Sequence, residues 1–178
     1  MTLGLVSSFA IGRPEMLIDK IASLIQEGDT VMDVGCGICN LYDAIKDKLD
    51  DPPRDYIGID IDSSIVHKAL LRFPEIAIYV GSVYDLIQYD RYDVVAGIEL
   101  FTCEPKSTKG VQEMIDHCNK KVIVTFYKMD NLPEFIEQLF YVESWNYIPH
   151  DLDPKIVIVE IWKRFIPTRT LTMGVVYE

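Results

Sequence analysis

The chain has 178 residues, 49% of them hydrophobic and 25% charged, which is long enough for one well-buried domain and too short for two of ordinary size. This composition excludes a disordered or fibrous chain, and no apolar run approaches the roughly eighteen residues that cross a bilayer. The formal net charge is 17 minus 28, or −11, which disfavours binding to long nucleic acid. Four scattered cysteines and a start without basic residues before Arg13 predict a cytoplasmic protein.

The first half of the chain alternates apolar strands with amphipathic helices. Pro14 can open a first helix and Gly28 can end it. The predicted strands are uniformly apolar, as buried parallel strands are, and span residues 30–34, 55–60 and 76–81. The predicted helices between them carry apolar residues at helical spacing and span residues 41–49 and 63–73, with Ser63 or Ser64 as the cap of the second.

The second half continues this alternation and then changes. Strands at residues 92–98 and 120–128 flank a helix whose apolar face is Val111, Met114, Ile115 and Cys118. Asp130 is a plausible cap for a helix over residues 132–140. Residues 141–148 and 155–163 then form two strands with only a turn between them, a length that joins antiparallel neighbours.

These elements predict an α/β fold, a Rossmann-like doubly wound sheet of seven strands that is mostly parallel with an antiparallel C-terminal hairpin strand. We expect one domain over residues 1–178, in which residues 1–28 form an N-terminal flap and helix and residues 165–178 form a C-terminal extension. In such a sheet the ligand binds past the carboxyl ends of the strands, where the strand order reverses.

The stretch "DVGCG" is the predicted start of that binding site. Gly35 and Gly37 permit a sharp turn between strand and helix, and Asp60, at the end of the second strand, can accept from both ribose hydroxyls. A dinucleotide site prefers glycine or alanine at position 40, where this chain has Asn40. Asp33 would repel a pyrophosphate and favour a cation, as in the sulfonium and ammonium groups of S-adenosylmethionine.

Four segments in order, "DVGCG", "GIDID", "VGSVYDL" and "YDVVAGIEL", make residues 12–164 resemble class I S-adenosylmethionine-dependent methyltransferases. The resemblance implies an enzyme that transfers a methyl group by in-line displacement with S-adenosylmethionine as cofactor. It implies methionine contacts at the glycine turn, a ribose contact at Asp60, adenine packing on Ile61, and adenine contacts at the third segment. The implied cofactor-binding residues are Asp33, Gly35, Cys36, Gly37, Asp60, Ile61, Ser82 and Val83.

The loop "GIELFTCEP" carries the information on the methyl acceptor. It lacks the Asn/Asp-Pro-Pro-Tyr motif of adenine-N6 enzymes and the Pro-Cys of cytosine-C5 enzymes, which favours a small-molecule or protein acceptor. Lys20, Lys128 and Glu160 leave open a ribose 2′-O tetrad, and so an RNA ribose or base methyltransferase is the alternative. Glu99 is the candidate for a base or for a group that orients the acceptor, and no catalytic residue is assigned beyond it.

Two further alternatives concern partners and metals. Asn40 and Ser82 depart from the usual residues of the family, which leaves room for a non-catalytic binding subunit with this fold. The chain has no insertion that could close the site, so a homodimer or a partner subunit is a further expectation. Cys36 and Cys39 could be half of a zinc site with Cys103 and Cys118, but the spacing favours buried thiols and no metal is predicted.

Overall fold

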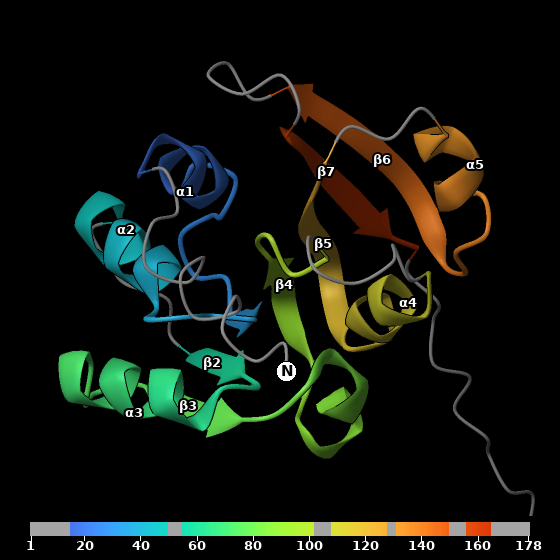
Figure 1. The fold of residues 1–178 in the computed structure, drawn as a ribbon. Helices are drawn as coiled ribbons and strands as arrows, with labels where there is room; N and C mark the ends of the chain where they lie inside the picture. The colour runs from blue at the N-terminus through green and yellow to red at the C-terminus, as the bar shows by residue number, and fades with distance from the viewer. Residues whose placement is uncertain (1–14, 50–54, 102–107, 128–130, 150–155, 165–178) are drawn as a thin grey trace, which may run out of the picture.

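The computed structural model describes residues 15–49, 55–101, 108–127, 131–149 and 156–164. They form one seven-stranded sheet in the order β3-β2-β1-β4-β5-β7-β6 (Figure 1). The strands are β1 Val31–Val34, β2 Tyr56–Asp60, β3 Ala77–Val80, β4 Tyr92–Gly97, β5 Cys118–Tyr127, β6 Val142–Pro149 and β7 Ile156–Lys163. The helices are α1 Glu15–Ala22, α2 Asn40–Lys48, α3 Ser63–Arg72, α4 Thr108–Asp116, α5 Leu132–Ile136 and the 3-10 helix η1 Val83–Gln88.

The order of the strands confirms the predicted fold class. The pairs that join β3, β2, β1, β4 and β5 are all parallel, and the direction of winding reverses between β1 and β4. The antiparallel strand is β7, which lies between β5 and β6 and pairs with both. The second strand of the hairpin, β7, therefore lies inside the sheet, and the first strand, β6, lies at its edge. The site predicted where the strand order reverses lies beyond the carboxyl ends of β1 and β4.

Two hydrophobic cores cover the two faces of the sheet. Helices α1, α2 and α3 lie on one face, and η1, α4 and α5 lie on the other (Figure 1). Alternate residues of β1 serve the two cores, with Val31 facing α1 and α2 and Met32 facing α4. None of the described helices is long and apolar enough to cross a membrane.

Several local predictions were wrong or concern residues that the structure does not describe. The cap of α3 is Asp62, whose carboxylate accepts from the backbone N–H of Ser64, so both serines lie inside the helix. Cys118 is the first residue of β5, because α4 ends at Asp116. Helix η1 had no predicted counterpart. Asp130, Cys103, Lys128 and the segments 1–14 and 165–178 lie outside the described residues.

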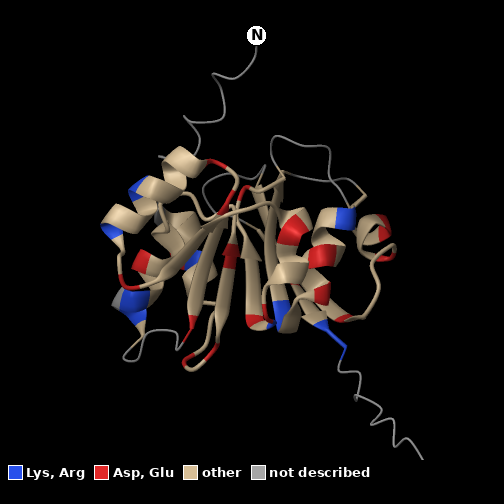
Figure 2. Cartoon of the chain, turned by 90° about the horizontal axis from the view of Figure 1, so that it is seen from below, with Lys and Arg blue, Asp and Glu red and all other residues tan. Residues whose placement is uncertain are grey.

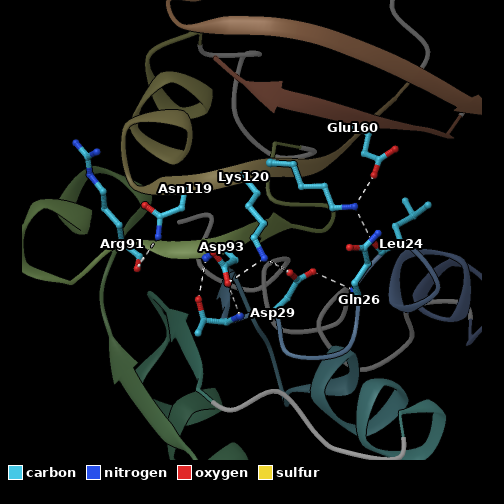
Figure 3. Close-up of polar contacts among 10 residues, drawn as sticks. Leu24, Gln26, Asp29, Arg91, Asp93, Asn119, Lys120 and Glu160 are labelled. Atoms are coloured by element: carbon cyan, nitrogen blue, oxygen red, sulfur yellow. Dashed lines mark hydrogen bonds and ion pairs between the residues drawn. The ribbon is translucent and has the colours of Figure 1, made fainter. Parts of the chain in front are cut away.

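A charged network joins the amino ends of β1, β4 and β5 (Figure 3). Lys120 Nζ lies 2.7 Å from the buried Asp29 carboxylate and 3.3 Å from that of Asp93. Lys121, itself buried, lies 2.7 Å from Glu160 and donates to the carbonyl of Leu24 at the end of α1. These contacts bind the first helix and the last strands to the centre of the sheet.

Candidate functional site

The glycine turn between β1 and α2 is held by the end of β2. The N–H groups of Gly35 and Cys36 both donate to the carbonyl of Ile59, over 2.7 and 3.0 Å. Gly35 and Gly37 have φ of 72° and 57°, a region that side chains with a Cβ disfavour. Both glycines therefore have the backbone conformation of the sharp turn that the sequence predicted.

Asp60 connects the turn to β2. Its carboxylate accepts from the N–H of Gly37 with one oxygen and from the N–H of Asp62 with the other, at 2.9 Å in both cases. A carboxylate oxygen accepts more than one hydrogen bond, so each oxygen keeps capacity for a hydroxyl. Asp60 thus both fixes the turn and presents a carboxylate beside it.

An apolar surface adjoins this carboxylate. Ile61 follows Asp60 and is 72% exposed, which is unusual for isoleucine in a folded domain. Val80, at the end of the neighbouring strand and in register with Asp60, is 54% exposed. A carboxylate next to two exposed aliphatic side chains fits a nucleoside, which needs acceptors for its ribose and an apolar surface for its base.

Ser82 and Val83 start η1 beside this surface. The Ser82 hydroxyl accepts from the N–H of Tyr84, and the Ser82 N–H donates to the Asp85 carboxylate, so the two residues form a capping box. The side chain of Val83 is buried in the core against α4. Ser82 therefore has a local structural role in addition to any contact with a ligand.

Asp33 lies below the turn rather than open to it. Its side chain is fully buried, and its carboxylate accepts from the Tyr56 hydroxyl over 2.7 Å. Burial, followed by the charge of Asp33, raises the pKa of Tyr56 well above 10, so the phenol stays a donor. Asp33 is consequently placed to act on a cation through the electrostatic field of the turn.

Cys36 and Cys39 fill the space over a glycine of β2. A Cβ at Gly58 would lie 2.9 Å from the Cys36 sulfur and 3.1 Å from that of Cys39, so only glycine fits there. A hydrogen bond between the two thiols, together with burial, raises the pKa of Cys36. No cluster of three metal-ligating side chains occurs among the described residues, and these thiols are packed in the core.

The loop after β4 combines strain with close packing. Glu99 has φ of 54°, and its N–H donates to the hydroxyl of the buried Thr125 on β5 over 2.6 Å. Leu100 lies between the first and fourth strands, since its side chain would meet a Cβ at Gly35 at 2.9 Å and one at Gly97 at 3.3 Å. Strain of this kind at a non-glycine residue is typical of functional sites.

One proposed member of a 2′-O tetrad, Glu160, has another partner in the structure. Glu160 is in the middle of β7, in register with Ile123, and is bound by Lys121. Lys20 belongs to the last turn of α1, and Lys128 lies outside the described residues. Glu160 therefore belongs to the charged network, which argues against its role as the glutamate of a tetrad.

The sequence motifs did not identify Leu100 or Thr125. Leu100 is an apolar residue in the same loop as Glu99, and the acids of that loop were the candidates for a role in the site. Its position shortly after the end of β4 indicated that Leu100 also lies near the site. The contact of Thr125 with Glu99 spans 26 residues of chain. No local pattern identifies such a partner.

Comparison with known proteins decides the family. Residues 32–122 match the family model described as a methyltransferase domain, which is more than half of the chain. The chain belongs to this methyltransferase family. The match includes β1 to the start of β5, and thus the glycine turn, Asp60 and the Glu99 loop. It confirms the expected class I enzyme, for which S-adenosylmethionine is the methyl donor.

Solved structures with the same fold are distant in sequence. Magnesium protoporphyrin IX methyltransferase from Synechocystis PCC 6803, with bound S-adenosylmethionine, is 14% identical, with 85% of this chain and 79% of that chain covered and a TM-score of 0.66. A TehB-like S-adenosylmethionine-dependent methyltransferase from Corynebacterium glutamicum is 14% identical, with 88% and 92% covered and a TM-score of 0.65. The plantazolicin methyltransferase, in complex with a triazolic desmethylPZN analogue and S-adenosylhomocysteine, is 14% identical, with 89% and 90% covered and a TM-score of 0.67. No curated protein sequence matches the methyltransferase significantly.

Proposed function

We propose that the methyltransferase binds S-adenosylmethionine along the carboxyl ends of β1, β2 and β3. The observation that carries this proposal is the Asp60 carboxylate, fixed by two backbone N–H groups next to the exposed Ile61. Asp60 would hold the ribose and Ile61 would pack on adenine, with Ser82 and the N–H of Val83 at its edge. Gly35, Cys36 and Gly37 would border the methionine part, and Asp33 would favour its positive charge from below.

We further propose a small-molecule or protein acceptor. The bound cofactor supplies a methyl group on a sulfonium, and the protein has to orient the acceptor and exclude water. Leu100, which packs against Gly35 and Gly97, would exclude water between β1 and β4. Glu99 would orient or deprotonate the acceptor. The compounds named for proteins of the same fold, magnesium protoporphyrin IX and plantazolicin, differ widely in structure.

An RNA acceptor remains the alternative, and charge argues against it. Among the described helices α3 carries only basic charge, from Lys68 and Arg72, whereas α4 and α5 have three acids against one lysine. In Figure 2 acidic residues lie on the α4 and α5 side, and others lie on the opposite side and at the ends of the strands. A long polyanion would meet this acidic side as well as the overall charge of −11.

The non-catalytic alternative rested on Asn40 and Ser82. The structure gives both residues a local function, because Asn40 accepts from Arg72 and Ser82 caps η1. The unusual residues at positions 40 and 82 are therefore explained by these local contacts, and they do not indicate a cofactor site that has lost its function. This observation favours an active enzyme over a binding subunit.

Calorimetric titration of the purified protein with S-adenosylmethionine, S-adenosylhomocysteine and NADH tests the cofactor site. We expect micromolar binding of the first two and none of NADH. The affinity should fall at least about tenfold in Asp60→Ala, which loses the ribose acceptor. Full affinity in that variant, with its fold retained, would contradict the proposed geometry.

Transfer of labelled methyl groups tests the choice of acceptor. We expect label in the small-molecule or protein fraction of a cell extract, in wild type but not in Asp60→Ala. Label confined to RNA, and lost on ribonuclease treatment, would establish the alternative. Cofactor binding without label in any fraction would support the non-catalytic subunit.

Three broader proposals complete this assignment. Residues 1–178 form a single domain, supported by one sheet with both faces covered. A cytoplasmic location is supported by the free thiols of Cys36, Cys39 and Cys118. A second copy or a partner subunit closes the site, which sedimentation with and without S-adenosylhomocysteine tests by a change in assembly.

A further inference from the structure

The outer side of the glycine turn is bound by an arginine that no motif indicated. Arg72, the last residue of α3, donates to the carbonyl of Ile38 over 3.3 Å and to the side-chain carbonyl of Asn40 over 2.7 Å. The same guanidinium forms an ion pair with Asp43 and stacks on the ring of Phe73, 4.7 Å from its centroid. One side chain thus contacts three residues of the turn and of the first turn of α2.

The backbone from Ile38 to Asn40 needs contacts from other parts of the chain to hold its conformation. Cys39, which precedes α2, has φ of 59° and provides no side-chain cap for the helix. A left-handed non-glycine residue is strained and persists only where its surroundings hold it. Arg72 holds the residues on both sides of Cys39, since its acceptors are Ile38 and Asn40.

The turn is therefore held from two directions by a single structural unit. On the inner side, Ile59 and Asp60 of β2 bind the N–H groups of Gly35, Cys36 and Gly37. On the outer side, Arg72 at the far end of α3 binds Ile38 and Asn40. Because α3 follows β2 directly, the proposed ribose-binding acid and the arginine belong to one strand–helix unit.

We propose that Arg72 is a positioning residue for the methyl donor: it fixes the turn from Gly35 to Asn40 in the conformation that binds the cofactor. This inference rests on the proposed cofactor site. It also assigns Asn40, the residue that departs from the usual pattern, as the acceptor for this arginine. Arg72 itself touches no reacting atom in this proposal.

Substitution of Arg72 tests the proposal against a matched control. Lys48→Met removes another helix-to-helix ion pair, between α2 and Asp19 of α1, and its side chain is as exposed as that of Arg72, at 36%. Lys48 lies in the last turn of α2, away from the glycine turn. A variant that is merely less stable should resemble this control.

We expect the dissociation constant for S-adenosylhomocysteine to rise about tenfold or more in Arg72→Met. Arg72→Lys keeps the charge but not the planar fork, so it should lose part of this affinity. Lys48→Met should bind as the wild type does. Hydrogen exchange of the amides of residues 38–43, without ligand, should quicken in both Arg72 variants and not in the control.

Asn40→Ala keeps the test decisive if Arg72→Met does not fold. It removes one acceptor and leaves Arg72 its other partners, and its effect should not add to that of Arg72→Lys in the double variant. Unchanged affinity in the folded Arg72 variants, or an equal loss in Lys48→Met, would overturn the inference. If the wild type bound no S-adenosylhomocysteine, the cofactor site itself would fail, a result distinct from an Arg72 variant that binds normally.

Discussion

The two ends of the parallel sheet both contain carboxylates, but they hold them differently. At the amino end Asp29 and Asp93 face Lys120, and Glu160 faces Lys121 (Figure 3). At the carboxyl end Asp60 is held by the backbone N–H groups of Gly37 and Asp62. An ammonium group cancels the charge that it binds, whereas a neutral N–H fixes a carboxylate and leaves its negative charge.

This difference distinguishes the charge-neutralised end of the sheet from the end that carries the proposed cofactor site. A neutralised pair contributes to stability but attracts no ligand. A carboxylate held by amides keeps a negative potential that suits a sulfonium, an ammonium group or a pair of hydroxyls. Substitutions at the amino end should therefore change stability alone, and substitutions at the carboxyl end should change affinity more than stability.

Lys121→Met should give the largest loss of stability. It leaves Glu160 buried without its ammonium partner, which costs about 3–5 kcal/mol of the free energy of unfolding. Urea denaturation measures this loss, and calorimetry should show unchanged affinity for S-adenosylhomocysteine in the folded fraction. A large change in affinity would contradict the separation of the two ends.

Gly35→Ala should give the largest loss of affinity. The left-handed φ costs alanine about 1–2 kcal/mol, and its Cβ would lie 2.9 Å from Leu100. We expect cofactor binding to be lost while the protein still unfolds cooperatively. Gly28→Ala is the control, because Gly28 also has a positive φ but meets nothing within 4 Å. Its strain should lower stability without changing affinity.

The Tyr56→Phe substitution tests a residue that lies between the amino and carboxyl ends of the sheet. Removing the hydroxyl eliminates one hydrogen bond to the buried Asp33, which costs about 1.5–3 kcal/mol of stability. Affinity for S-adenosylhomocysteine should fall only slightly, since Tyr56 lies below the turn. Thermal unfolding and calorimetry on the same samples measure both quantities. A strong loss of affinity with little loss of stability would place Tyr56 in the site.

The change of stability with pH above 10 gives a second test of the buried Tyr56 phenol. Its raised pKa keeps the phenol protonated in the folded protein while the unfolded chain loses that proton above about pH 10. Stability should therefore fall as pH rises above 10. The fall should be shallower in Tyr56→Phe by up to about 1.4 kcal/mol per pH unit. Burial also raises the pKa of Tyr92, to about 12, so part of the slope should persist in the variant.

Ser82→Ala should have the smallest effect of the set. Loss of this cap of η1 costs about 1 kcal/mol. We expect the affinity for S-adenosylhomocysteine to fall less than tenfold, because the Val83 N–H remains. Equilibrium titration and urea denaturation measure the two changes. An affinity loss as large as that of Asp60→Ala would make Ser82 a principal adenine contact.

The alternation of strands and helices was predictable because it depends on neighbours along the chain. Apolar runs and helical spacing located every strand, and the glycines marked the turn at which β1 meets α2. The boundaries were less certain: Asp62 caps α3 in place of the serines, and Cys118 begins β5. The first error arises because adjacent polar residues compete for one cap position, and the second because an apolar spacing does not fix where a helix ends.

The sequence alone determined the family and the fold class, because both depend on short segments in a fixed order. The tertiary structure alone decided which side chains are partners. Asp33 binds Tyr56, Asn40 binds Arg72 and Glu160 binds Lys121, and these partners lie 23, 32 and 39 residues apart. Such contacts depend on how the strands are ordered and how the helices pack over them, and no local spacing records that arrangement.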